Sequence, residues 1–513
     1  MRCWKSGGVF VLFVGWALLA ASCASETESG AEVLQGDTGT GVMVFEGARL
    51  IPGDGSAAIE SSVFVVENGR FTLAGQQGEV QVPEEATHVD LSGKTVMPAK
   101  VDLHGHLCFE DVVEGTTSKA NFNRENCIEQ LERLAYMGFS TVVSIADVME
   151  REVFPGDHIE VYQTPRSEVD VPPVGGRYPW GDVPLQLHGD IIPNAAQFFT
   201  TGTAIAFPGG GAGGHPSRND VMYPVATEGE ARRAVRDYVS SFTSRNIELP
   251  WIKIWVDDRG GRVETLTPPL YRAVIDEATQ LGVPVAAHTV KLADAKELYR
   301  AGMVGAVHIP IRSGDVPDEE LLGIVRDLVA RSDRPIWFTD PGNTTALGNE
   351  AWEDPVLYEM LSPDQVRALQ GRDGDGGGPR TAEAVRNARE SSMRTGDVAR
   401  QLIGAGMIMV YGSDNGSAGR GFGWYEQLKF ENWITMGFTP HDAIVFATHN
   451  GAMALGRDDI GMIEAGRSAD FIVLDANPLD DIANTRQIDM VYLRGQKIDR
   501  DGMRERWQAR WPG

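Results

Sequence analysis

Two histidines separated by a single glycine end an apolar run near residue 100. The run is Val101-Asp102-Leu103-His104-Gly105-His106. In a β-strand, side chains at positions i and i+2 lie on the same face, so His104 and His106 would present their imidazoles together. Neutral imidazole is a common ligand of zinc and similar divalent ions. A pair with this spacing at a strand end therefore indicates a metal site.

Four later apolar runs each contain one more side chain that could bind a metal. In three of them it follows the carboxyl end of the run, where the parallel strands of a barrel present their chemistry. The fourth is a lysine inside Trp251-Ile252-Lys253-Ile254-Trp255-Val256, and a buried lysine is costly unless it is paired or chemically changed. We therefore expect the histidine pair to be joined by residues from four other strands. These are Lys253, His288, His308 and Asp414.

The sequence between about Ala99 and Leu455 alternates apolar strands with amphipathic helices. In one unit, Thr267-Pro268 begins a helix and Gly282 ends it, before a strand at Val283–Ala287. The next unit has a helix from about Leu292 to Ala301. Such alternation predicts an α/β fold, a (β/α)8 TIM barrel over residues 99–456, with a doubly wound sheet as the alternative.

Short alternating strands flank this region. Asn68-Gly69, between two such strands, is typical of a tight hairpin because both residues tolerate a positive φ. Similar strands return after Gly461. We expect residues 41–98 and 457–505 to form one small β-sandwich domain.

Three segments give the chain a family resemblance. Thr95-Val96-Met97-Pro98, leading into the histidine pair, resembles the first-strand motif of the amidohydrolase superfamily. The runs Ala447–Ala452 and Gly461–Asp470 resemble the segment that leads out of that superfamily's barrel. One departure is Ala99-Lys100, where Pro-Gly is usual. The resemblance implies a metal-dependent hydrolase, closest to its prolidase-like and imidazolonepropionase-related branch.

The resemblance also implies a binuclear site, most often of zinc. A water shared by the two ions would give hydroxide near neutral pH, which attacks a carbonyl. Asp414 would take the water's proton and pass it to the leaving group. By position, His104, His106 and Asp414 would hold one ion, His288 and His308 the other, and Lys253, as a carbamate, would bridge them.

Two further residues are candidate substrate contacts. Gly213-Gly214-His215 resembles a Gly-Gly-His loop that lines the pocket of peptidase-like amidohydrolases, so His215 is expected to contact substrate. Arg259 follows the Lys253 strand and could bind a substrate carboxylate. Its alternative is a local ion pair with Asp257 or Asp258.

The N-terminus is expected to be an export signal. Residues 1–22 combine Arg2 and Lys5 with an apolar stretch, and Leu19–Cys23 resembles a bacterial lipobox, with Cys23 as the lipidation site. An ordinary secretory signal is the alternative. Residues 23–40 have the composition of a tether. This predicts a periplasmic or cell-envelope lipoprotein that meets the membrane only through its lipid; whether Cys108 and Cys127 pair stays open.

Composition excludes several classes of protein. The 513 residues include 46 basic and 72 acidic side chains, a formal net charge of −26, which would repel nucleic acid. Four cysteines are too few for a disulfide scaffold. A serine-hydrolase elbow of the GxSxG type is absent from the sequence.

The sequence therefore predicts a binuclear amidohydrolase that cleaves an amide bond in a small molecule such as a dipeptide or an N-acyl amino acid. Hydrolysis of a cyclic amide, lactone or phosphotriester at the same site is one alternative. A non-catalytic surface binding lipoprotein is another. A homo-oligomer is compatible with the sequence.

Overall fold

The computed structural model describes residues 41–83, 85–112, 121, 123–145, 183–211, 222–311, 314–340, 342–370, 380–416 and 421–511. These residues belong to one unit, residues 41–513. The predicted signal, tether and lipidation site at Cys23 lie outside the described residues, as does His215. Among the described helices, none is long and apolar enough to cross a membrane.

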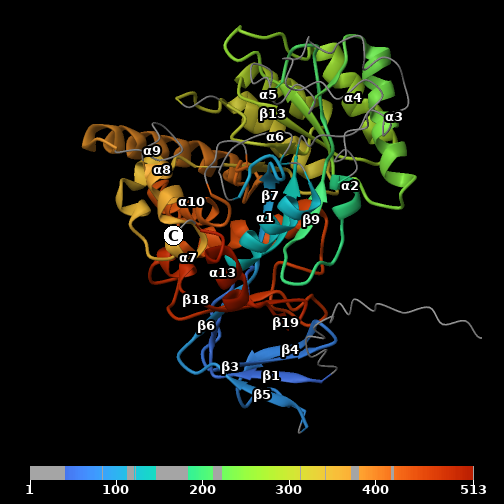
Figure 1. The fold of residues 1–513 in the computed structure, drawn as a ribbon. Helices are drawn as coiled ribbons and strands as arrows, with labels where there is room; N and C mark the ends of the chain where they lie inside the picture. The colour runs from blue at the N-terminus through green and yellow to red at the C-terminus, as the bar shows by residue number, and fades with distance from the viewer. Residues whose placement is uncertain are drawn as a thin grey trace, which may run out of the picture. The chain divides into compact units, whose positions relative to one another are not determined.

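Two parallel sheets form the larger part of this unit, which is a mixed α/β fold (Figure 1). The first has the strand order β7-β8-β9 and the second the order β11-β10-β12-β13-β14-β15-β16, with every pairing parallel. The strands are β7 (Lys100–Gly105), β8 (Phe139–Ser144), β9 (Gln197–Thr200), β10 (Ala204–Ala206), β11 (Met222–Pro224), β12 (Ile252–Val256), β13 (Val285–Thr289), β14 (Gly305–Ala306), β15 (Trp337–Thr339) and β16 (Ile408–Val410).

The edges of the two sheets meet where β7 lies beside the segment that follows β16. Gly105 and Asn415 form a parallel bridge. The backbone N–H of Leu103 donates to the carbonyl of Tyr411 at 3.0 Å, and that of Asp414 donates to the carbonyl of His104 at 2.6 Å. The histidine pair and Asp414, far apart in sequence, are thereby joined through their backbones.

Helices separate most of the successive strands, and Figure 1 shows α4, α5 and α6 around β13. The predicted helix 292–301 is confirmed as α5, which ends at Gly302 in the left-handed conformation. The helix after Thr267-Pro268 is confirmed as α4, although the Thr267 side chain makes no cap hydrogen bond. The larger helices are α1 (Arg124–Tyr136), α3 (Glu228–Thr243), α4 (Pro268–Gln280), α5 (Leu292–Ala301), α6 (Glu319–Arg331), α9 (Ala382–Gly404), α10 (Trp424–Thr435), α11 (Pro440–Ala447) and α12 (His449–Leu455). The shorter helices are α2 (Val183–Leu187), α7 (Leu357–Met360) and α8 (Pro363–Gln370).

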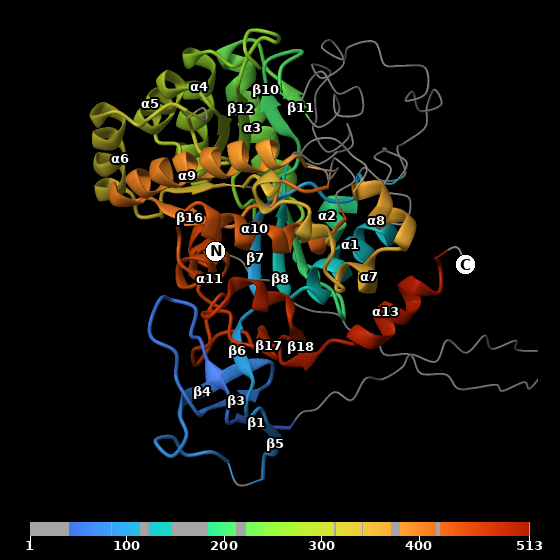
Figure 2. The same ribbon diagram turned by 90° about the vertical axis from the view of Figure 1, so that its left-hand side faces the viewer.

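Two smaller sheets combine both ends of the described chain. One has the order β4-β3-β1-β5, and the other the order β19-β18-β17-β6-β2, in which β6 pairs antiparallel with β17 (Figure 2). Phe45 and Phe64 of the first sheet meet Phe471 of the second, with ring centroids 5.2 Å apart in both contacts. The strands are β1 (Met43–Glu46), β2 (Arg49–Leu50), β3 (Ser62–Glu67), β4 (Arg70–Gln76), β5 (Thr87–Asp90), β6 (Thr95–Pro98), β17 (Phe471–Leu474), β18 (Ile488–Leu493) and β19 (Gln496–Lys497).

The hairpin at Asn68-Gly69 and the last helix of the described chain can be compared with the expectations from the sequence. The hairpin at Asn68-Gly69 is confirmed, since φ is 52° at Asn68 and 75° at Gly69 and Glu67 pairs with Arg70. The last helix, α13 (Arg500–Gln508), begins inside the range assigned to the β-sandwich domain. It packs instead on α1, with the Tyr136 and Trp507 ring centroids 5.2 Å apart.

Candidate metal centre

The histidine pair and Asp414 lie together at the junction of β7 and β16. His104 is buried on β7 and His106 follows its last residue. The Nε2 atoms of His104 and His106 lie 3.3 Å and 3.1 Å from Oδ1 of Asp414. One potential ligand atom from each of the three side chains falls within a 4.8 Å cluster. His104, His106 and Asp414 are called the first group.

Backbone contacts and the Asp102 carboxylate fix the first group. Nδ1 of His106 lies 2.8 Å from the carbonyl of Ile145, which can only accept a hydrogen bond, so Nδ1 donates to it and Nε2 is the nitrogen that faces Asp414. The Asp102 carboxylate accepts from the backbone N–H of His104 at 2.9 Å and of Ser413 at 3.1 Å. The segment after β16 approaches β7 so closely that position 412 requires glycine, because a Cβ there would lie 2.7 Å from Cβ of His104.

The other three candidate ligands belong to neighbouring strands of the seven-stranded sheet: Lys253 and His288 lie on β12 and β13, and His308 follows β14. The His308 ring centroid is 4.9 Å from that of His104 and 4.9 Å from that of His288, so it links the two sheets. Lys253 is buried on β12, close enough to Asp414 for that carboxylate to act on its pKa. Lys253, His288 and His308 are called the second group.

Side chains of β12 fix His288. Its ring stacks on Trp255 with a centroid distance of 4.2 Å and an interplanar angle of 14°. Its Nε2 lies 3.2 Å from Oδ2 of Asp257. Lys253, Trp255 and Asp257 share one face of the extended chain because they alternate along it.

Burial sets the charge state of most of these side chains. It lowers the pKa of His104 and of His288 to about 4, so both rings are neutral at pH 7 and can act as ligands. It also lowers the pKa of Lys253 well below its ordinary value, with Asp414 opposing the shift. Burial alone would raise the pKa of Asp414, but the neighbouring histidines, chiefly His104, outweigh it and hold that pKa well below its usual range.

Two candidate ligands have backbone conformations that side chains rarely adopt. φ is 98° at His308 and 51° at Asp414. Each is held by its own N–H, which donates to Oγ1 of Thr339 at 2.9 Å for His308 and to the carbonyl of His104 at 2.6 Å for Asp414. Strain of this kind concentrates at functional sites.

Arg259 follows β12 in the chain, and its side chain lies over the ring of Trp255. Its guanidinium is 5.0 Å from the Trp255 ring centroid, and its backbone N–H donates to Oδ1 of Asp257 at 2.9 Å. Asp258 pairs with Lys291. Within the described ranges, neither neighbouring carboxylate forms a side-chain ion pair with Arg259, so the local pairing considered from the sequence is not the arrangement found.

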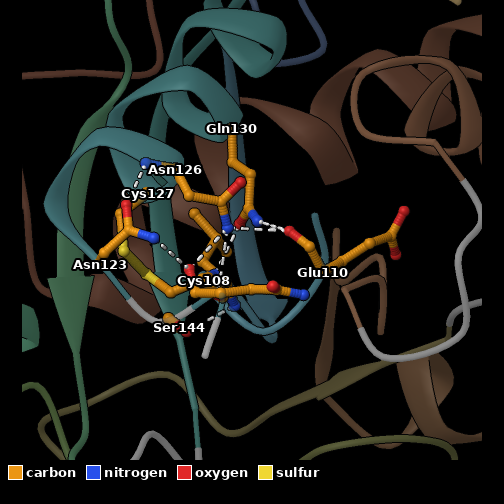
Figure 3. The surroundings of a disulfide bond; sticks show 9 residues. Cys108, Glu110, Asn123, Asn126, Cys127, Gln130 and Ser144 are labelled. Atoms are coloured by element: carbon orange, nitrogen blue, oxygen red, sulfur yellow. Dashed lines mark hydrogen bonds between the residues drawn. A yellow bond between two sulfur atoms is a disulfide. The ribbon is translucent and has the colours of Figure 1, made fainter. Parts of the chain in front are cut away.

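The segment after the histidine pair is fastened to α1 by a disulfide (Figure 3). Cys108 and Cys127 are bonded, which answers the question that the sequence left open. The Gln130 side chain accepts from the N–H of Cys108 at 2.6 Å and donates to the carbonyl of Glu110 at 2.6 Å. Asn126 donates to the same Glu110 carbonyl at 2.9 Å.

Sequence reasoning missed three residues that position the candidate ligands. Thr339 was not considered, and nothing in its local sequence distinguishes it. Trp255 was treated only as an apolar neighbour of Lys253, and Asp257 only as a partner for Arg259. Strand alternation from Lys253 could have found both Trp255 and Asp257.

Sequence comparisons with known proteins find likenesses over parts of the chain. Residues 379–498, which include Asp414, match the amidohydrolase family model. The imidazolonepropionase of Streptomyces griseus is 34% identical over 126 residues, which are 24% of this chain and 32% of that protein. The 5-methylthioadenosine/S-adenosylhomocysteine deaminase of Moorella thermoacetica is 30% identical over 114 residues, 20% of this chain and 26% of that protein. The matched segments thus span a third or less of these relatives.

Solved structures extend the likeness to most of the chain. A Xaa-Pro dipeptidase with bound methionine has a TM-score of 0.61 at 20% identity and covers 89% of this chain and 100% of its own. A molinate hydrolase also has a TM-score of 0.61 at 20% identity, covering 90% of this chain and 96% of its own. Residues 379–498 of this chain thus match the amidohydrolase family model, and its fold is similar to those of the dipeptidase and the molinate hydrolase.

Proposed function

We propose that this protein is a metal-dependent amidohydrolase that cleaves a C–N amide bond in a small molecule. The observation that carries the proposal is the convergence of four imidazoles, a carboxylate and a buried lysine on one centre from five different strands or the residues that follow them. A structural role alone gives no reason to gather so many metal-binding side chains there.

The donor set fits two divalent ions. Imidazole nitrogens and carboxylate oxygens suit zinc and its neighbours, and both histidines of the first group direct Nε2 toward Asp414. The first group would hold one ion, and His288 and His308 the other. Lys253 would bridge them as a carbamate.

The burial of Lys253 favours this modification. A neutral amine is the form that reacts with carbon dioxide, and burial lowers the pKa of Lys253 well below its ordinary value. The nitrogen lone pair bonds to the carbon of carbon dioxide, and one N–H proton leaves to water. The product is an anionic carbamate in place of the neutral amine.

The metal ions would lower the pKa of water and polarise the substrate carbonyl. Asp414 is the residue of the chain that would transfer the proton. It is ionised, and its carboxylate would take a proton from the attacking water and pass it to the leaving nitrogen.

The substrate class is inferred from the site's surroundings. Arg259 offers a guanidinium above Trp255, which suits a substrate carboxylate such as that of a dipeptide or an N-acyl amino acid. His215 is proposed as a second substrate contact. Cyclic amides, lactones and phosphotriesters are alternative substrates, and metal-free binding without turnover is the alternative of a different class.

The two parallel sheets are nearly continuous at β9 and β10. β9 pairs with β8 and β10 pairs with β12, and only residues 201–203 separate β9 from β10. We infer that β9 and β10 are one interrupted strand, which with the β7–β16 junction would close an eight-stranded barrel. The two smaller sheets would form the β-sandwich domain.

We also propose that the protein is exported. Disulfides form and persist mainly in oxidising compartments, and the buried Cys108–Cys127 bond supports such a location. The lipid anchor at Cys23 and a homo-oligomeric state remain proposals from the sequence.

A substrate panel tests the activity. Zinc-loaded protein is expected to hydrolyse at least one dipeptide or N-acyl amino acid, to lose this activity with a chelator and to regain it with zinc. Lys253→Ala should be inactive until a short carboxylic acid is added to replace the carbamate. Binding that persists without metal, with no turnover of any panel member, would contradict the proposal.

A further inference from the structure

The Asp257 carboxylate has no role in the proposed reaction, yet it lies against a proposed metal ligand. It is buried, with 6% of its surface exposed. Its Oδ1 accepts from the backbone N–H of Arg259 at 2.9 Å, which fixes the carboxylate, and its Oδ2 lies 3.2 Å from Nε2 of His288.

The contact between Asp257 and His288 determines where the imidazole proton lies. An ionised carboxylate oxygen can only accept a hydrogen bond, so Nε2 must be the protonated nitrogen. In a neutral ring the lone pair then lies on Nδ1. His288 therefore differs from His106, whose Nδ1 donates to the Ile145 carbonyl and whose Nε2 faces the centre.

Packing against two neighbouring rings fixes the position and the plane of the His288 imidazole. Trp255 stacks on it at 4.2 Å and fixes its plane. His308 meets it edge-on, at 4.9 Å between centroids and an angle of 83°. These contacts still permit the ring to be flipped by 180°, which exchanges the positions of the two nitrogens. Asp257 decides between the two orientations.

We propose that Asp257 is a positioning residue that holds His288 with Nδ1 turned toward the metal centre. This rests on the proposed function, because it assigns His288 to one of two ions. Partners of this kind, which hydrogen-bond the outer nitrogen of a ligating histidine, typically change metal affinity by about 10- to 100-fold when removed.

Metal titration tests the proposal with a readout other than turnover. Metal-free wild type, Asp257→Ala and Asp257→Asn are titrated with Co²⁺, following visible absorbance and the metal content after dialysis. Asp257→Ala should bind one of two ions about 10- to 100-fold more weakly. Asp257→Asn keeps one oxygen acceptor for two donors, the N–H of Arg259 and Nε2 of His288, so its affinity for that ion should lie between those of wild type and Asp257→Ala. Asp258→Asn, which removes the adjacent charge that pairs with Lys291, should titrate like wild type.

Two titration results would overturn the proposal. If Asp257→Ala binds both ions as tightly as wild type, Asp257 does not position a ligand. If Asp257→Ala weakens the binding of both ions equally, Asp257 does not act through His288.

A measurement on the metal-free wild type tests the proposal even if the Asp257 variants fail to fold. Long-range ¹⁵N–¹H correlation of ¹⁵N-histidine protein, with His288→Gln to identify the signals, should show His288 protonated at Nε2. Protonation at Nδ1 would overturn the proposal. Wild type that binds no metal but has this tautomer would contradict the proposed function while leaving the orientation by Asp257 intact.

Discussion

Backbone groups position His106 and Asp414 in the first group, whereas side chains position His288 and His308 in the second. In the first, His106 is held by a carbonyl and Asp414 by a backbone hydrogen bond to its neighbouring strand. In the second, His288 is held by Trp255 and Asp257, and His308 by the hydroxyl of Thr339. A backbone contact does not depend on the identity of the residue that supplies it. The second group should therefore be the more sensitive to substitution of its neighbours.

The largest expected effect concerns Asp414, the centre of the first group. Asp414→Asn removes the proposed proton acceptor, so kcat should fall by about 10²- to 10⁴-fold, the range typical of general acid–base catalysis. The measurement is steady-state hydrolysis of the best panel substrate by zinc-loaded protein, with Asp258→Asn as the control. Retention of half the wild-type kcat would remove Asp414 from the chemistry.

Removing the Cys108–Cys127 disulfide should lower the stability of the protein without weakening metal binding by the first group. Cys108→Ser, Cys127→Ser and the double variant should each lose about 2–5 kcal/mol of unfolding free energy, as is typical when a native disulfide is removed. Backbone contacts should nevertheless keep the first ion's affinity close to that of wild type in protein that remains folded. Denaturant unfolding and Co²⁺ titration measure the two quantities. A matching loss of metal affinity would show that the first group also depends on its neighbours' side chains.

The pH dependence of stability should be similar for the two groups, since burial lowers the pKa of both His104 and His288 to about 4 from 6.5. Below pH 6.5 the unfolded chain takes up protons that these folded rings do not, so stability falls as the pH decreases from about 6.5 to 4. Each ring contributes up to about 3 kcal/mol, at 1.36 kcal/mol per pKa unit.

Denaturant unfolding of metal-free protein at several pH values in this range measures how steeply the unfolding free energy falls with decreasing pH. His104→Gln and His288→Gln should each make this slope smaller. A slope unchanged by either substitution would mean that the ring concerned titrates normally in the folded protein.

The smallest expected effect concerns Trp255. Trp255→Leu keeps an apolar side chain but loses the flat surface that fixes the His288 plane, so the second ion should bind about tenfold more weakly, at the lower end of effects for residues that support ligands. The first ion should bind unchanged. The readout is Co²⁺ titration, and equal weakening of both ions would remove the distinction between the groups.

Much of the local structure could be predicted because local contacts determine it. Asn68-Gly69 forms its hairpin because both residues tolerate positive φ, and α5 ends at Gly302 for the same reason. Strand boundaries were less accurate: the strand expected at 283–287 is β13 at Val285–Thr289. Its ends depend on pairing with β12, which is not visible in one segment.

The sequence by itself determined which side chains could bind metal, because their types, spacing and positions at apolar runs can be read along one strand at a time. Only the tertiary structure decided how they are held. The Cys108–Cys127 bond, the contact of His308 with Thr339 and that of His288 with Asp257 join residues 19, 31 and 31 positions apart. The direction in which an imidazole presents its lone pair is set by what faces its other nitrogen, and that partner is supplied by chain packing.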